Sequence, residues 1–484
     1  MYPEWRRDRA RRCHSNPAVF RRSFRRASEQ RVLIPAPIQG RDEKVVQTLD
    51  SPKSSNAWPL RIRARKPAVS AQIRTIRIGI LGLGKVGQAV ARLAADRSAT
   101  AHAGLRFQVE RALVRDAGKP RVSVDQARVT ADPDVFLRGN YDVVVEALDA
   151  VEPARTLVAR LLGRGTSVVT ANKALVAAHG AHFESIASAR GAAFRYEATA
   201  LAAVPFLGTL AARPLVASVD RVRAIVNGTS NYLLTLLAEP GASFDHALSQ
   251  AQALGYAEPD PARDLDGLDA ADKLLLLTSL FGWGRLSKEA LDVSGIRHVT
   301  ADDLAAARSI GGTIKAVVSA ERDATGVRAF VGPAFLPSAE PLASLGGALN
   351  GIRLDGRHVS NLFFSGPGAG PDVTAATLLD DAVQAASFER KIHERPRGPV
   401  HPVFPTSPAT PWFVRVTFPG VLPGAAAAAS VAAGVGLPVE RVADHATCNS
   451  RWLFIGPQGR RDIDAALERL STTHRIESAA FRRL

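Results

Sequence analysis

The sequence predicts an α/β protein with a parallel-sheet nucleotide-binding domain, a second α/β domain and a small C-terminal module. Three observations predict this class. Near residue 80 an apolar strand changes to helical spacing across a glycine-rich turn. Nearly continuous apolar strands then alternate with helices, as in a buried parallel sheet. Finally, residues 412–484 place strands and helices in the order βαββαβ.

Composition places the chain among globular proteins. The 484 residues are 46% hydrophobic and 22% charged, which is typical of such proteins and sufficient for about two to four domains. No apolar run approaches the roughly 20 residues that a membrane span needs, so we expect no membrane partner. The two cysteines, Cys13 and Cys448, offer neither a disulfide framework nor a metal site. We therefore expect a reducing, cytoplasmic setting.

The net charge of +16 comes mainly from the N-terminal segment. Residues 1–70 hold 17 Lys and Arg against 6 Asp and Glu, which leaves +5 for the rest of the chain. Residues 1–72 also lack hydrophobic periodicity and contain several prolines, so we expect a basic disordered extension. A mis-assigned gene start is the alternative. Nucleic-acid binding is not expected of the folded body.

A phosphate-binding turn is predicted after the first strand, at 76–81. Here Gly82-Leu83-Gly84-Lys85-Val86-Gly87 forms G-x-G-x-x-G at the opening of a helix. In that position the glycines permit a tight turn and close backbone approach, and the helix N-terminus faces a pyrophosphate. The motif alone is weak, but a strand before it and a helix after it favour a dinucleotide site.

The second strand, at about 106–114, ends beside charged residues that bear on cofactor choice. An acidic residue there holds the ribose 2′-hydroxyl of NAD, whereas an arginine accommodates the 2′-phosphate of NADP. Arg115 and Asp116 are adjacent, with Lys119 and Arg121 close by. The balance favours NADP and leaves NAD open.

Two further strands and a helix carry the chain to the expected ligand edge. Strand 141–147 is nearly all apolar, and helix 153–163 and strand 166–170 follow. Lys173 thus lies at the carboxyl end of a parallel strand, where α/β sheets bind ligands. A solvated loop lysine is the alternative interpretation.

Beyond strand 193–197 the chain enters the second domain. A strand near 219–226 ends at the turn Asn227-Gly228, and Thr229 or Ser230 is expected to cap the next helix. Residues 361–382 form another strand, glycine turn and helix. Residues 390–411 are a proline-rich linker, and 412–484 suggest a ferredoxin-like module.

The stretch from Gly255 to Leu277 concentrates the candidate chemistry. Prolines place Glu258 on a loop, and Asp266 is a plausible N-cap of the helix that follows. Asp269 and Lys273 are four residues apart on one face of that helix. A partly desolvated lysine gives and takes protons near neutral pH, which arginine does not. An ordinary capping residue and helix ion pair is the alternative.

Several motifs together resemble the homoserine dehydrogenase family. They are the glycine turn 82–87, TANK at 170–173, NGTSNYLL at 227–234, the acidic stretch 251–273 and GPGAG at 366–370. The resemblance covers about residues 74–385, and the 251–273 motif is highly specific. Residues 412–484 look like the ACT regulatory domain of many bacterial members. Nothing resembles an aspartokinase, so the form looks monofunctional.

The resemblance implies an NAD(P)H-dependent interconversion of aspartate 4-semialdehyde and homoserine, on the route to threonine and methionine. It implies a homodimer, possible amino-acid effectors at the ACT-like module, and the following domains: Rossmann at 73–198 completed by 361–389, and an α+β catalytic and dimerisation domain with a mixed sheet at 199–360. By motif position, catalysis falls on Lys273 and Lys173, and substrate binding on Glu258, Asp264 and Asp269. Cofactor binding falls on residues 82–87, Lys173 and Gly370, and the charged residues after the second strand add Arg115.

The family's monovalent cation site, a sodium site, would fall on Glu197, Ala200, Ala202 and Val204. Two departures stand out. Leu201-Ala202-Ala203 replaces the family's usual glycines, which narrows the nicotinamide pocket or alters the cation site. The ACT-like module also lacks the usual acidic residue before its Pro-Gly turn, TFPGVLPG at 417–424.

Two other functions are alternatives to the enzyme. One is a different amino-acid dehydrogenase with the same nucleotide-binding domain, which would not oxidise homoserine. The other is a non-catalytic ligand-sensing homologue built around the ACT-like module. Retention of both lysines and the three carboxylates, Glu258, Asp264 and Asp269, argues against the sensor.

Overall fold

The computed structural model describes residues 73–98, 104–121, 123–213, 218–284, 286–387, 409–447 and 449–484. The expected disordered extension 1–72, most of the linker 390–411, and both cysteines lie outside the described residues.

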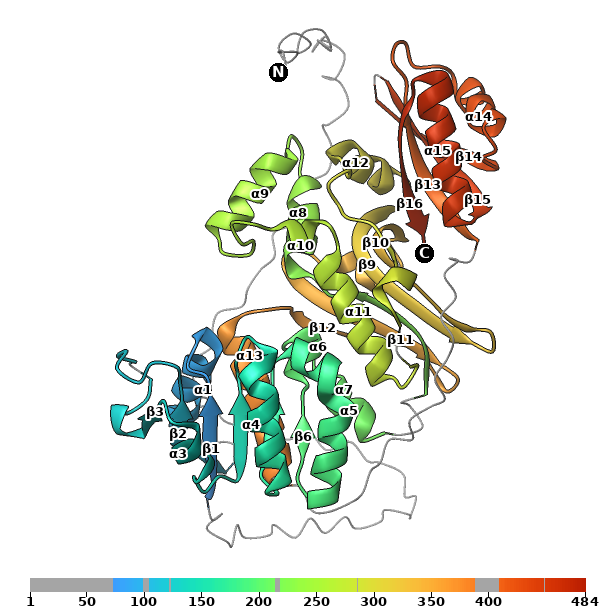
Figure 1. Cartoon of the computed structure of the whole chain (residues 1–484). Coiled ribbons are helices and arrows are strands. Elements are labelled where there is room, and N and C mark those ends of the chain that lie inside the picture. The colour runs from blue at the N-terminus through green and yellow to red at the C-terminus, as the bar shows by residue number, and fades with distance from the viewer. Residues whose placement is uncertain are drawn as a thin grey trace, which may run out of the picture. The chain divides into compact units, whose positions relative to one another are not determined.

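The first domain is a parallel six-stranded sheet with the strand order β3-β2-β1-β4-β5-β6. This is the order of the dinucleotide-binding doubly wound fold, so the predicted α/β class is confirmed. Figure 1 shows helices on both faces of this sheet. Its strands are β1 Arg74–Leu81, β2 Leu105–Leu113, β3 Val129–Thr130, β4 Val143–Glu146, β5 Ser167–Thr170 and β6 Phe194–Arg195. Its helices are α1 Lys85–Ala95, α3 Pro133–Leu137, α4 Val151–Gly163 and α5 Lys173–Arg190, with the 3-10 turn η1 Gln126–Arg128.

Burial explains why the central strands lack alternation. All four side chains of β4 and all four of β5 are buried, because helices cover both faces. One apolar cluster joins β1 and α1 to α13 (Pro371–Ala386). A second cluster on the other face contains residues of α4 and α5. The carboxyl ends of β1, β4 and β5 therefore form one rigid edge.

The predicted return segment 361–389 divides between the two sheets. Helix α13 packs against α1, as a completing element of the first domain should. The strand before it, β12 (Val359–Pro367), instead pairs antiparallel with β11 (Leu349–Gly356) in the second sheet. Assigning residues 361–367 to the first domain was wrong, because the chain crosses back only at the glycine turn 366–370.

The second sheet is mixed, as the resemblance implied. Its strand order is β12-β11-β7-β9-β10-β16-β13-β15-β14, and β8 pairs with β10. Its first strands are β7 Val219–Ile225, β8 Asp292–Val293, β9 Gly312–Asp323 and β10 Gly326–Pro337. An apolar cluster buries α11 (Leu268–Leu280) against β7 and β9. The remaining elements are α6 Ala198–Leu201, α7 Leu207–Ala211, α8 Gly228–Leu237, α9 Phe244–Ala253, α10 Ala262–Leu265, η2 Lys288–Ala290, α12 Ala301–Ser309 and η3 Pro341–Ser344.

The C-terminal module has the predicted βαββαβ order. Its elements are β13 Thr410–Thr417, α14 Ala425–Gly434, β14 Val439–Ala446, β15 Ser450–Gln458, α15 Arg460–His474 and β16 Glu477–Arg483. Its last strand, β16, runs parallel to β10, with Ala334 opposite Arg482 and Phe335 opposite Arg483. The module therefore extends the sheet of the second domain, which the sequence pattern did not indicate.

Polar contacts reinforce this junction. Asp303 on α12 is fully buried and pairs with Arg415 of β13. Its other carboxylate oxygen accepts a hydrogen bond from Trp452 Nε1 at 2.8 Å. Arg482 pairs with Asp292 and stacks 4.6 Å from the ring of Trp412. A buried carboxylate with paired donors fixes orientation as well as contact.

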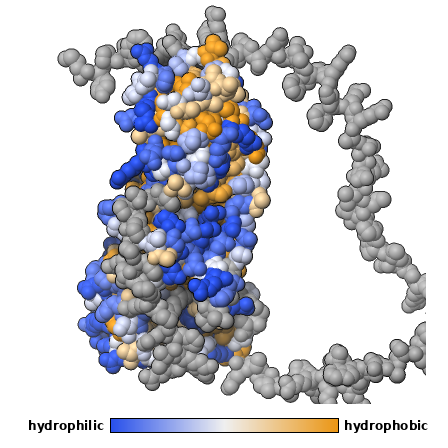
Figure 2. All heavy atoms as spheres, turned by 90° about the vertical axis from the view of Figure 1, so that its right-hand side faces the viewer, coloured by the Kyte–Doolittle hydropathy of each residue, from blue (hydrophilic) through white to orange (hydrophobic). Residues whose placement is uncertain are grey.

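The surface of this module is partly apolar. Figure 2 shows apolar residues gathered over the C-terminal module on the face that it displays. Helix α14 exposes its first three alanines, and Val421 in the preceding turn is 95% exposed. Among the described helices, none has the length and apolar character of a membrane span.

Two predicted helix caps differ in the structure. Asp266 ends α10 and pairs with Arg297, while Gly267 with φ 78° precedes α11. Asn227, rather than Thr229 or Ser230, caps α8, because its Oδ1 accepts a hydrogen bond from the Ser230 backbone N–H at 2.8 Å. Both errors have one cause, since several adjacent residues here satisfy the same capping preference.

Candidate active site

Two lysines share one carboxylate where the two domains meet. Asp269 lies in the first turn of α11, and its Oδ2 is 2.9 Å from Nζ of Lys273. Its Oδ1 is 2.9 Å from Nζ of Lys173, the first residue of α5. The ion pair thus joins the ligand edge of the first sheet to a helix of the second domain.

A second carboxylate is held beside this pair by an amide that sequence reasoning took only for a turn residue. Asn227 Nδ2 donates to Asp264 Oδ1 at 2.7 Å and to Asp269 Oδ2 at 3.0 Å. The same side chain caps α8 through its oxygen. Asn227 therefore fixes the separation of the two acids. Its place directly after a buried strand was the available signal.

The charges in this cluster are coupled. Burial disfavours ionisation of Asp269, but the ammonium groups of Lys273 and Lys173 outweigh burial and hold its pKa well below the usual range. Burial lowers the pKa of Lys273, and the nearby Lys173 charge lowers it further, whereas Asp269 opposes both effects. The anionic Asp269 therefore helps the desolvated Lys273 to keep its proton.

Unused hydrogen-bond capacity shows where a ligand atom fits. An ammonium group has three donors, and Lys273 spends two of them, on Asp269 and on the Val226 carbonyl at 2.6 Å. The Lys273 side chain is 13% exposed and that of Lys173 is 43% exposed. One donor of Lys273 and further donors of Lys173 therefore remain for an oxygen atom at this junction.

Glu258 lies apart from this cluster in the described structure. It is exposed on the loop between α9 and α10, where its backbone carbonyl accepts a hydrogen bond from Gln252 Nε2 at 3.1 Å. The structure thus brings together Lys173, Asp264, Asp269 and Lys273, and leaves Glu258 on the neighbouring loop.

The glycine turn has the geometry that a dinucleotide needs. Gly82 has φ +92°, and a Cβ there would come within 2.8 Å of the Ala147 carbonyl oxygen. A Cβ at Gly87 would overlap the Gly82 carbonyl oxygen, so that glycine allows α1 to pack on the turn. A Cβ at Gly84 would meet no atom within 4 Å. The turn is therefore open where a pyrophosphate approaches the N-terminus of α1.

Residues expected to select and cover the cofactor lie on nearby loops. Arg115 is exposed directly after β2. Arg121 Nη1 donates to the carbonyls of Asp116 at 3.0 Å and Lys119 at 2.8 Å, which organises this loop. Gly370, with φ +132°, is the N-cap of α13.

A buried acid at the ligand edge was missed in the sequence. Glu146 ends β4 with no exposed surface, and it accepts hydrogen bonds from the Thr170 hydroxyl and from the Leu148 N–H at 2.7 Å. Thr170 Oγ1 in turn accepts the Asn172 N–H, and Asn172 caps α5 immediately before Lys173. Glu146 therefore anchors the turn that positions Lys173. The feature of the sequence that could have identified Glu146 is an acidic residue within an apolar strand.

We predict that Glu146→Gln changes how stability depends on pH. Burial raises the pKa of Glu146 to about 7, whereas an unfolded glutamate titrates near 4.5. Between these values the folded state retains a proton that the unfolded state releases, so stability falls as pH rises. Relative to Glu146→Gln, the wild type should lose up to about 3 kcal/mol of unfolding free energy across this window. Urea unfolding at several pH values measures the difference.

An exposed glutamate gives the matched control. Glu239→Gln removes a carboxyl group from the surface after α8 and should leave a curve parallel to that of the wild type. If the Glu146→Gln curve also runs parallel to the wild type between pH 4.5 and 7, the buried-proton explanation is wrong.

The expected cation ligands surround a strained turn. The Glu197 carboxylate accepts the backbone N–H groups of Phe206 at 2.9 Å, Leu207 at 2.8 Å and Gly208 at 2.6 Å. The Ala202 carbonyl accepts the Thr377 hydroxyl at 3.0 Å, and Val204 O accepts Phe206 N. The Glu197 side chain thus caps α7, and the backbone carbonyls of Glu197, Ala202 and Val204 each already accept one hydrogen bond from within the chain.

Ala202 departs from ordinary alanine geometry. Its φ is 49° and its ψ is −97°, in a region that alanine rarely adopts, and the residue is 8% exposed. A glycine would adopt this conformation without the Cβ clash. The methyl group noted in the sequence therefore lies at a strained, buried turn next to α13.

Comparisons with known proteins place these features in a family. Residues 82–197 match the family model for the homoserine dehydrogenase NAD-binding domain, and residues 205–383 match that for homoserine dehydrogenase. The homoserine dehydrogenase of Synechocystis sp. is 34% identical over 339 residues, covering 66% of this chain and 76% of that protein. That of Mycobacterium leprae is 35% identical, covering 73% and 83%.

Solved structures agree in fold. A homoserine dehydrogenase from Thiobacillus denitrificans superposes with a TM-score of 0.72 at 29% identity, covering 85% of this chain and 98% of that one. A hyperthermophilic archaeal homoserine dehydrogenase in complex with NADPH gives a TM-score of 0.55 at 25% identity, covering 65% and 99%.

Proposed function

The chain belongs to the homoserine dehydrogenase family, and we propose that Lys273 is the proton donor in its reaction. The protein is an NAD(P)-dependent oxidoreductase that interconverts L-aspartate 4-semialdehyde and L-homoserine. One observation carries the proposal for Lys273: this largely buried lysine is paired with Asp269 and keeps an unused donor at the junction with the nucleotide-binding domain.

Each charged group of the site has a task that its position supports. Lys273 delivers a proton to the aldehyde oxygen as the carbonyl carbon is reduced. Asp269 orients both ammonium groups, and Lys173 binds the substrate or assists that proton transfer. Asp264 holds the substrate ammonium, because the hydrogen bond from Asn227 Nδ2 already fixes the position of its carboxylate. Glu258, from the neighbouring loop, is the second proposed acceptor.

The nucleotide-binding domain provides the binding site for the NAD(P) cofactor. Bound NAD(P)H provides the hydride for the aldehyde carbon. Backbone N–H groups of the turn 82–87 and the N-terminus of α1 would hold the pyrophosphate, and Gly370 is a further proposed cofactor-binding residue. We propose that Arg115 contacts a ribose 2′-phosphate and favours NADP over NAD.

We predict a preference for NADPH that depends on Arg115. The test follows NADPH and NADH oxidation separately with aspartate semialdehyde, using the full chain. Arg115→Ser should reduce kcat/KM with NADPH by about tenfold or more, because a charge-assisted phosphate contact is lost, and should leave NADH little changed. Arg138→Ser is the matched control, since Arg138 precedes β4 at the opposite edge of the sheet.

The outcomes separate the candidate functions. Turnover with neither nucleotide, despite nucleotide binding, would contradict the proposed chemistry and favour the ligand-sensing homologue. Reduction of other aldehydes but not aspartate semialdehyde would favour a different dehydrogenase. Equal loss of NADPH and NADH activity in Arg115→Ser would remove the 2′-phosphate assignment.

Further properties follow as proposals from family membership. We propose that the C-terminal module is an ACT domain with an amino-acid effector, supported by its βαββαβ order. We propose a homodimer, a cytoplasmic location, and a place in threonine and methionine biosynthesis. We also propose a sodium ion at the backbone carbonyls of Glu197, Ala200, Ala202 and Val204.

A further inference from the structure

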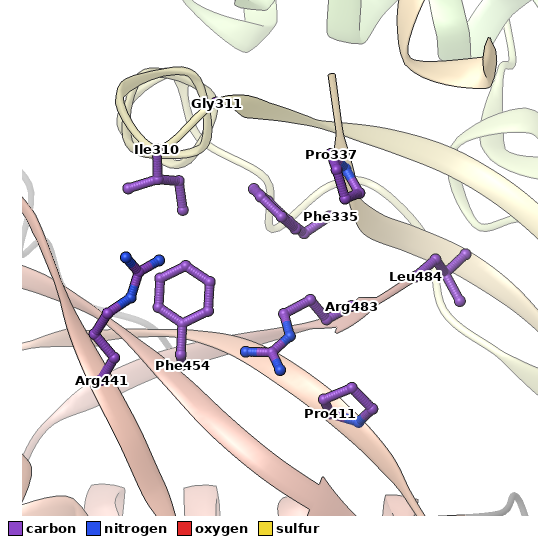
Figure 3. Close-up of a pocket in the computed structure, with 9 residues that line it drawn as sticks. All are labelled: Ile310, Gly311, Phe335, Pro337, Pro411, Arg441, Phe454, Arg483 and Leu484. Carbon is purple, nitrogen blue, oxygen red and sulfur yellow. The ribbon is translucent and has the colours of Figure 1, made fainter. Parts of the chain in front are cut away.

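A cavity lies at the junction between the C-terminal module and the second domain, away from the lysine cluster. Its volume is ≈ 370 Å³. The second domain contributes the end of α12 and one end of β10, and the module contributes the start of β13 with β14, β15 and β16 (Figure 3). The lining residues are Ile310, Gly311, Phe335, Pro337, Pro411, Arg441, Phe454, Arg483 and Leu484.

The charged side chains of this lining are both arginines. The Arg441 guanidinium lies 4.1 Å from the centroid of the Phe454 ring, and that of Arg483 lies 5.2 Å from it. Figure 3 shows the two guanidinium groups near this ring, on the module's side of the cavity. Arg483 also pairs with Glu440 at 3.0 Å, whereas Arg441 makes no ion pair within the described part of the chain. The lining therefore offers an uncompensated guanidinium.

The other lining residues are apolar. Phe335, Pro337 and Ile310 form a wall from the second domain, and Pro411 and Leu484 continue it. Small-molecule sites typically combine a mainly apolar wall with a few placed polar groups, in cavities of roughly 300–1,000 Å³. A planar guanidinium fork matches a carboxylate through two parallel hydrogen bonds. An acidic side chain, which a ligand ammonium would need, is absent from this lining.

We propose that this cavity binds a small monocarboxylate with a branched or cyclic apolar body and no charged amine. The Arg441 guanidinium binds the carboxylate, and the apolar wall buries the body. Because the walls come from two parts of the chain, an occupant contacts both, and binding strengthens the docking of the module through linkage.

Isothermal titration of the full chain tests the site with three probes. 4-Methylpentanoate carries both features, 4-methylpentanamide lacks the charge, and inorganic phosphate lacks the apolar body. We expect 4-methylpentanoate to bind at one site per chain, and each of the other probes to bind about tenfold more weakly or not at all. 4-Methylpentanoate should also raise the unfolding temperature of the protein, because it binds the state in which the module is docked on the second domain.

Variants locate the binding. Arg441→Gln keeps most of the side-chain length and should weaken 4-methylpentanoate binding about tenfold or more. Arg461→Gln makes the same charge change at an exposed position on α15 and should leave binding within about twofold. Ile310→Trp fills the cavity with Arg441 retained, so binding should be lost while the unfolding temperature stays near that of the wild type.

Each of the following results would overturn the proposal. They are no saturable heat with 4-methylpentanoate, equal weakening by Arg441→Gln and Arg461→Gln, and phosphate binding as tight as that of 4-methylpentanoate. Unchanged binding in Arg441→Gln would place the carboxylate elsewhere, for instance at the lysine cluster. Dehydrogenase turnover does not enter any of these outcomes, so failure here leaves the proposed reaction intact.

Discussion

Lys273→Met should lower kcat for the reduction of aspartate semialdehyde by about 10²- to 10⁴-fold, the usual contribution of a positioned general acid. The side chain of methionine fills similar space but carries no proton to donate. The partners of Lys273 are the Val226 carbonyl and Asp269, and none of the three is proposed to contact the nucleotide. The affinity for NADPH should therefore change little. Steady-state kinetics and a nucleotide titration measure the two effects separately.

Two other substitutions distinguish chemistry from loss of charge. Lys288→Met removes an exposed lysine that pairs with Asp272, the neighbour of Lys273 on α11. This substitution should leave kcat within about twofold. Lys273→Arg retains the charge and hydrogen bonds but not a titratable proton, so it should remain strongly impaired. Near-full turnover in Lys273→Met or Lys273→Arg would remove the assignment.

The pH profile supplies an independent signature. Reduction needs the protonated lysine, so its rate should fall as pH rises through the lowered pKa of Lys273, below the ordinary lysine value of 10.5. Homoserine oxidation needs the neutral amine and should rise over the same range. Asp269→Asn removes the charge that favours protonation of Lys273. The pH transitions of both reduction and oxidation should therefore move to lower pH.

Local sequence patterns predicted most elements of the fold. The glycine turn, the strands of the first sheet and the βαββαβ order follow from periodicity and turn chemistry, which act over a few residues. The partners of β12 and β16 did not follow from them. An apolar strand pattern specifies a buried strand but not which sheet it joins, because edge pairing is decided by contacts distant in sequence.

The site divides in the same way. Asp269 and Lys273 were predictable together because helical spacing places residues four apart on one face. The link from Asp269 to Lys173 spans 96 residues, and only the resemblance brought the two lysines together beforehand. Asn227 and Glu146 were not identified as site residues, because each resembles an ordinary local feature, a turn and an isolated strand acid. Their importance lies in non-local partners, Asp264 and Thr170.

Asp303→Ala should destabilise the junction with the C-terminal module by about 3–5 kcal/mol, the usual effect of removing one partner of a buried ion pair. The substitution removes the carboxylate partner of the Arg415 guanidinium, 15% exposed, which keeps only the Thr300 hydroxyl as an acceptor, and it leaves the buried Trp452 N–H without its acceptor. It also removes the capping box with Thr300 at the start of α12. Urea unfolding should show the loss, and hydrogen exchange should rise in β13 and β15 before β1 and β4.

A neighbouring acid and a double variant make this prediction specific to the junction. Asp302→Ala removes the same charge from the first turn of α12 at an exposed position, so its cost should stay within about 1 kcal/mol. Asp303→Leu combined with Arg415→Met removes both charges and should recover part of the stability that Asp303→Leu alone loses, because no buried charge then lacks a partner. Equal costs for Asp302→Ala and Asp303→Ala would mean that β10–β16 pairing and apolar contacts, rather than this ion pair, hold the module in place.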